Sequence, residues 1–202
     1  MWFNLAPDAW QALSLLTLVA LVFTALMFDV GQRRIPNQLV LLALVAGFSL
    51  NLIGPQSWLR DGGGLFTFYP GALGVRGAML GALTGLAVFL PFYMLRAMGA
   101  GDVKLMAGMG SFVGPVAAIN LALFILVMGG VLAVVRMVWL RKSRLVLANV
   151  VTALGQVWPG STTSFDPATQ SADRMPYGVA MAAGLLAYGA WIFSGHYPIV
   201  NF

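Results

Sequence analysis

Aspartates are the main candidates for chemistry in this sequence, because other reactive residue types are nearly absent. The chain has no cysteine and no glutamate, and His196 is its one histidine. These absences exclude thiolate zinc sites, a cysteine nucleophile and a metal site built from several histidines. Any acid–base chemistry must therefore fall on six residues, which are Asp8, Asp29, Asp61, Asp102, Asp166 and Asp173.

Asp29 and Asp102 differ from the other four, because each lies at the boundary of a long apolar stretch. Acidic residues in membrane segments are rare and usually functional. Two close carboxylates can share one proton, so that one is ionised and the other protonated. The ionised group then takes a proton from water, and the protonated group polarises a scissile carbonyl. The pair predicts peptide hydrolysis without a serine, a cysteine or a metal.

Each of these aspartates also has a structural interpretation. Asp29 is one helical turn before Arg33 and is suitably spaced to pair with it. Asp102 follows Gly99-Ala-Gly101 and is a favoured residue type for the N-cap of a helix. The other four aspartates are expected to be solvated charges in polar segments.

Three neighbours of Asp102 are candidates for binding a substrate. Gly99 and Gly101 lack side chains and would let the backbone approach an extended peptide closely. Lys104 is placed to steady an ionised Asp102 or a substrate carbonyl. Its structural alternative is a lysine that extends along the apolar surface to the membrane interface.

The composition places these residues in a membrane protein. Hydrophobic residues make up 60% of the chain, charged residues 8%, and the mean hydropathy is +0.88. Soluble domains carry about 25% charged residues. These values exclude a soluble globular domain, a disordered chain and a nucleic-acid-binding module. The net charge of +5 is interpreted as topological, and the expected partner is the lipid bilayer.

Uncharged stretches predict an all-α bundle of about six transmembrane helices, the fourth of them short, in one domain over residues 1–202. Residues 105–135 contain no charge and would span about 46 Å as one helix, more than the roughly 30 Å bilayer core. A break at Gly114–Pro115 places nine of the eleven basic residues on one side, which is therefore cytoplasmic. The predicted segments are 11–28, 38–54, 76–96, 102–113, 115–138 and 176–194.

Two features complete the predicted organisation. Residues 139–175 are expected on the cytoplasmic surface, with an amphipathic helix at 141–158 followed by a flexible loop at 159–174. Gly77, Gly81 and Gly85 recur every four residues and form a small-residue ridge that lets helices pack closely.

Three stretches resemble the motifs of type IV prepilin peptidases, which are membrane aspartyl peptidases of the Gly-x-Gly-Asp type. They are DVGQRRIPN at 29–37, GAGDVKL at 99–105 and MPYGVA at 175–180. The resemblance implies that Asp29 and Asp102 are the catalytic pair, with no metal and no cofactor. It also implies cleavage of the basic leader of prepilin and pseudopilin precursors at the cytoplasmic face of the inner membrane.

Larger members of that family add an N-terminal methyltransferase region and a cysteine-rich zinc loop. This sequence has no cysteine, and its first predicted segment begins within a dozen residues. It is therefore similar to the short branch that serves tight-adherence (Flp) pili, or to archaeal preflagellin peptidases.

Two other functions are compatible with part of the pattern. In a small proton- or cation-coupled transporter, Asp29 and Asp102 would relay protons or bind a cation. A pathway across the bilayer would favour acids at several depths, whereas these two lie at one face. In a non-catalytic assembly subunit, both aspartates would be structural.

Overall fold

The computed structural model describes residues 6–55, 64–67, 70–95, 97–139 and 177–200. Within these residues the chain forms six α-helices and no β-strand, which confirms the predicted all-helical fold. Each of the six predicted segments overlaps one helix. The helices are α1 (Pro7–Gln32), α2 (Asn37–Ile53), α3 (Gly74–Met94), α4 (Ala100–Val113), α5 (Pro115–Trp139) and α8 (Tyr177–Phe193). The amphipathic helix predicted at 141–158 and the loop at 159–174 lie outside the described residues.

Three of these helices are long and apolar enough to cross a membrane, namely α1, α3 and residues Pro115–Arg136 of α5. Helices α2 and α8 are apolar but shorter. Helix α4 has 14 residues and spans about 21 Å, less than the roughly 30 Å hydrocarbon core. The number of membrane crossings therefore stays a prediction, although the fourth segment is short as expected.

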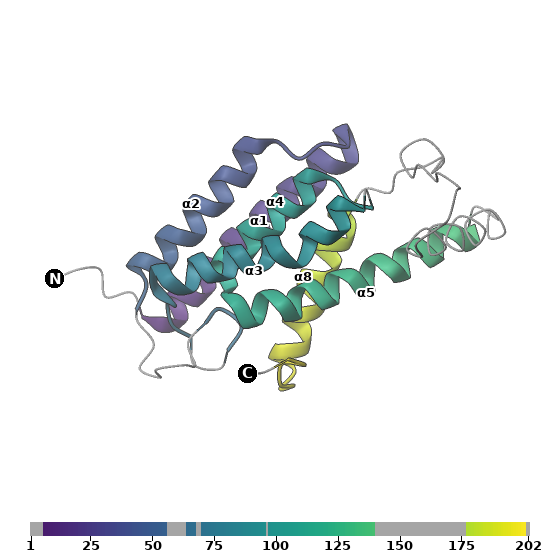
Figure 1. The fold of residues 1–202 in the computed structure, drawn as a ribbon. Helices are drawn as coiled ribbons and strands as arrows, with labels where there is room; N and C mark the ends of the chain where they lie inside the picture. Colours follow the sequence, from purple (N-terminus) through teal and green to yellow (C-terminus); the bar gives the residue numbers. More distant parts are fainter. Residues whose placement is uncertain (1–5, 56–63, 68–69, 96, 140–176, 201–202) are drawn as a thin grey trace, which may run out of the picture.

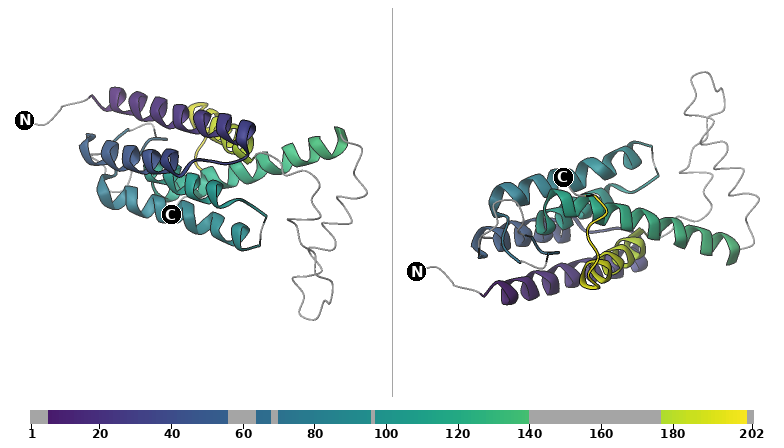
Figure 2. Two further views of the ribbon diagram at one scale, coloured as in Figure 1. Left: turned by 90° about the horizontal axis from the view of Figure 1, so that it is seen from above. Right: turned by 90° about the horizontal axis from the view of Figure 1, so that it is seen from below.

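Successive helices run in opposite directions along the bundle (Figure 1). As a result, α1 and α3 end where α2, α4 and α8 begin, and we call this the site end of the bundle. Figure 2 shows that α5 extends beyond the other helices at this end. Chain direction alone therefore brings segments from both halves of the sequence to the site end.

Helix α4 is the central element of the fold. It packs against α1, α2, α3 and α5, and it is buried from Asp102 to Val113 apart from Lys104. Its last turn exposes backbone carbonyls that have no partner within the helix. The buried side chain of Asn51 on α2 donates to the carbonyl of Ser111 at 2.9 Å and accepts from the N–H of Leu73 at 2.9 Å. One side chain thus links α2, the end of α4 and the residue before α3.

The predicted helix break at Gly114–Pro115 lies between α4 and α5. Gly114 has a φ of 82°, a conformation that glycine adopts at little steric cost. Pro115 is the first residue of α5, where its missing N–H removes no helical hydrogen bond. The break is therefore built from the two residue types that favour it.

The glycine ridge brings the backbones of α3 and α4 together. A Cβ atom added at Gly81 would overlap the carbonyl oxygen of Gly110, and one at Gly85 would lie 2.5 Å from the carbonyl oxygen of Met106. Gly77 differs, because its Cβ would meet Leu73 rather than α4. Two of the three ridge glycines therefore set the close packing of α3 on α4.

Candidate active site

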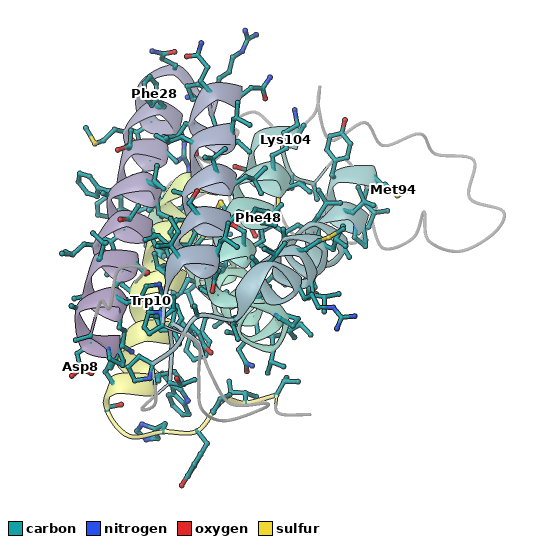
Figure 3. All side chains as sticks on the ribbon, turned by 90° about the vertical axis from the view of Figure 1, so that its left-hand side faces the viewer. Asp8, Trp10, Phe28, Phe48, Met94 and Lys104 are labelled. Carbon is teal, nitrogen blue, oxygen red and sulfur yellow. The ribbon has the colours of Figure 1, made fainter. Side chains whose placement is uncertain are left out.

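Asp29 and Asp102 lie at the site end of the bundle. Asp29 is in the last turn of α1 and Asp102 is in the first turn of α4. Figure 3 shows Phe28 and Lys104, which are close in sequence to Asp29 and Asp102, toward one end of the bundle, and Asp8 and Trp10 toward the other. The side chains of Asp29 and Asp102 are both buried, with exposed fractions of 7% and 8%. The charge of Asp29 acts on the Asp102 carboxyl group, although 73 positions separate them in sequence.

The remaining aspartates are not brought to this pair in the described part of the chain. Asp8 is exposed at the opposite end of the bundle (Figure 3). Asp61, Asp166 and Asp173 lie outside the described residues. Within those residues no group of three or more histidine, cysteine, aspartate or glutamate side chains is placed to hold a metal ion.

Asp102 is held by the backbone at the start of its own helix. The N–H of Gly99 donates to Oδ2 of Asp102 at 3.1 Å. Gly99 is the N-cap residue and Asp102 stands at the third helical position, so the alternative of Asp102 as N-cap is wrong. This contact is the half of a capping box that a carboxylate supplies, since glycine has no side chain to complete the other half.

Asp29 is held by a different helix. The N–H of Gly178, in the first turn of α8, donates to Oδ2 of Asp29 at 2.6 Å. Arg33 contacts Asp29 through the backbone, donating its N–H to the Asp29 carbonyl oxygen at 2.9 Å. Arg33 ends α1 in the left-handed conformation, with φ of 53°. No Asp29–Arg33 ion pair is found in the described part of the chain, so the predicted alternative for Asp29 is not observed.

The three predicted substrate-binding residues lie beside Asp102. Gly99 supplies the N–H described above, and a Cβ at Gly101 would lie 3.2 Å from Cβ of Ile35, the residue before Pro36. The exposed ammonium of Lys104 donates to Oδ1 of Asn37 at 3.1 Å. Lys104 thus bridges the beginnings of α4 and α2, and its contact is with an amide rather than with Asp102. Their roles in binding stay predictions.

Tyr177 and Gly178, in the first turn of α8, also lie in this region, although the sequence predicted no role for either residue. Besides Gly178, Tyr177 interacts electrostatically with Asp102, and its ring packs edge-on against Phe89, with centroids 6.4 Å apart. Their signal in the sequence is the motif at 175–180 at the start of the last apolar segment. The motif marks the region, but its partner on α1 is visible only in the fold.

Comparison with known proteins identifies the family. The sequence profile of the type IV leader peptidase family matches residues 16–134, which include both buried aspartates. This chain belongs to the type IV leader peptidase family. The family inferred from the motifs is therefore confirmed, and the first two motifs lie within the matched residues, whereas the third, at 175–180, lies outside them.

One relative of this leader peptidase family member is the prepilin leader peptidase/N-methyltransferase of Aeromonas hydrophila. The two are 32% identical over 114 residues. The aligned region is 55% of this chain and 35% of the relative, so this chain matches about a third of the relative's length. No solved structure matches this chain.

Proposed function

We propose that this chain is a membrane-embedded aspartic endopeptidase that removes the leader peptide of type IV prepilin-like precursors. The observation that carries the proposal is the burial of Asp29 and Asp102 together at one end of the helical bundle. Membership of the leader peptidase family supplies the substrate class. In this proposal the six helices form one peptidase domain.

The arrangement suits a mechanism in which water is the nucleophile. One carboxylate is ionised and takes a proton from water, which attacks the scissile carbonyl carbon. The protonated partner donates to the carbonyl oxygen as the tetrahedral intermediate forms. When the intermediate collapses, the C–N bond breaks and the leaving amine receives a proton from the pair. Gly99 and Gly101 would let the extended peptide approach, and Lys104 would contact a substrate carbonyl.

The basic residues favour a site that faces the cytoplasm. Arg33 and Arg34 follow α1, Lys104 lies near the start of α4 and Arg136 near the end of α5, whereas Arg76 lies near the start of α3 at the opposite end. Lysine and arginine are retained preferentially on the cytoplasmic side of the inner membrane. This asymmetry supports an active site at the cytoplasmic face, where a basic leader would arrive.

Topology reporters test this orientation. Reporters fused after Arg34, Lys104 and Arg144 are expected to read cytoplasmic, and a reporter after Gly63 is expected to read external, because of the distribution of basic residues. The signals of paired phosphatase and fluorescent-protein fusions provide the measurement. An external reading after Arg144 would contradict the turn between α4 and α5.

A cleavage assay tests the activity itself. The protein purified in detergent is expected to cut a peptide with a basic leader, a glycine and an apolar helix, with one product pair seen by mass spectrometry. The matched control is the same peptide with alanines in place of the basic residues, which should be cut more slowly. If folded protein leaves the basic peptide intact, the peptidase assignment is wrong, and proton flux in vesicles becomes the assay of the transporter alternative.

A further inference from the structure

We propose that the first turn of α8 is a third part of the catalytic site, in which the backbone N–H of Gly178 positions the carboxylate of Asp29. Gly178 is thus a positioning residue for the aspartate pair. This inference rests on the proposed peptidase function and adds a component that lies beyond the family-matched residues 16–134.

The hydrogen bond from Gly178 is the first support. It joins residues 149 positions apart, and both residues are buried. Its N–O distance of 2.6 Å is shorter than the roughly 2.7–2.9 Å of charge-assisted hydrogen bonds, so the contact is close. The first N–H groups of a helix have no partner within the helix, so the N–H of Gly178 is available to bond to Asp29.

The helix ends add a reason why Asp29 needs this contact. Asp29 lies in the last turn of α1, where the partial negative charge of the helix terminus disfavours an ionised side chain. The N-terminus of α8 carries the opposite partial charge. Docking α8 against the end of α1 therefore offsets an unfavourable site for a carboxylate.

Glycine at position 178 allows the start of α8 to approach Asp29 closely. A Cβ atom there would lie 3.0 Å from Oδ2 of Asp29, 3.1 Å from its Cβ and 3.2 Å from Cα of Leu26. Two of these three contacts are with the aspartate itself. A larger residue would displace the carboxylate by a few tenths of an ångström, which approaches the tolerance of about 0.5 Å within which catalytic groups must be held.

The two aspartates are held in parallel ways. Each uses Oδ2 to accept a backbone N–H from a helix start, Gly178 for Asp29 and Gly99 for Asp102. Within the described residues, the other oxygen of each carboxylate has no hydrogen bond. That oxygen is left to share the proton and to contact water and substrate. Asp102 is fixed within its own helix, whereas Asp29 depends on the docking of α8.

A main-chain ester tests the proposal without adding bulk. Glycolic acid incorporated at position 178 of the full chain replaces the N–H by an oxygen. We expect kcat for cleavage of the leader peptide to fall about 10- to 100-fold with KM unchanged. The control is the hydroxy-acid analogue of valine at 179, whose N–H is also in the first turn of α8 and which should retain the wild-type kcat.

The outcomes separate this inference from the proposed function. A 178 ester that cleaves at the wild-type kcat would overturn the positioning role, and so would equal losses for the 178 and 179 esters together with a lower Tm. If the wild-type protein itself cleaves no leader peptide, the proposed function fails instead.

Side-chain variants of α8 give a second measurement. Gly178→Ala is expected to lower kcat with little change in Tm, since it displaces Asp29. Gly184→Ala places a Cβ 2.5 Å from Cγ1 of Ile125 on α5, away from the aspartates, and is expected to lower Tm while kcat per folded molecule is retained. A Gly178→Ala protein with lower Tm and unchanged kcat would contradict the inference.

Discussion

Asp29→Asn and Asp102→Asn are each expected to lower kcat for leader-peptide cleavage by about 1,000-fold or more, and the double variant should be little worse than either. In the proposed mechanism the two carboxylates act as one unit, because one must be ionised and the other must carry the shared proton. An amide in either position removes that proton exchange. Initial rates of peptide cleavage by the purified variants provide the measurement.

These variants isolate the chemistry from the fold. Asparagine keeps the size of aspartate, and its carbonyl oxygen can still accept the N–H groups of Gly178 and Gly99. Asp→Glu should also be largely inactive, since one added methylene moves the carboxylate by about 1 Å. Asp8→Asn is the matched control, because Asp8 is exposed at the opposite end (Figure 3). A folded Asp102→Asn protein that cleaves near the wild-type rate would refute the assignment of the pair.

Gly81→Ala is expected to cost about 3 kcal/mol of stability and to lower activity as well. Its Cβ would overlap the carbonyl oxygen of Gly110 and would lie 2.7 Å from Cα of Gly114. Both neighbours are backbone atoms, so the strain is relieved only if α3 and α4 separate. Because α4 carries Asp102, such a movement also disturbs the site. Thermal unfolding in detergent measures the loss as a lower Tm.

Gly130→Ala on α5 is the control for that experiment. No heavy atom lies within 4 Å of the position that its Cβ would occupy. Alanine in a helix is favoured over glycine by about 0.5–1 kcal/mol, so this variant should be as stable as the wild type or slightly more stable. If Gly81→Ala and Gly130→Ala unfold at the same temperature, the close packing of α3 on α4 is wrong.

The positions of the helices were predictable from the sequence because the bilayer simplifies the problem. A membrane helix needs only sufficient apolar length, and its ends are marked by charges and by breakers such as Gly114–Pro115. The distribution of lysine and arginine then predicts the orientation. The same patterns placed Asp29 and Asp102 at the membrane boundary and selected them from six aspartates.

The contacts between helices were not predictable in this way. In lipid the outer surface of a helix is as apolar as its packed surface, so hydropathy does not show which face meets a neighbour. On α1, for example, Leu16 is 70% exposed and Leu18 is 1% exposed, although both are leucine. The sequence therefore did not indicate that the Asp29 side chain bonds to Gly178 rather than to Arg33.

What the sequence by itself determined is the set of groups available for chemistry in this protein: two carboxylates at the ends of apolar stretches, glycines and a lysine beside one of them, and no cysteine in the chain. Only the tertiary structure decided how those groups are held. It joined Lys104 to Asn37 and placed the N–H of Gly178 on Asp29 across 149 positions. The physical reason is that composition and length specify a helix in a bilayer, whereas a contact between helices depends on the shapes of two surfaces that meet only after folding.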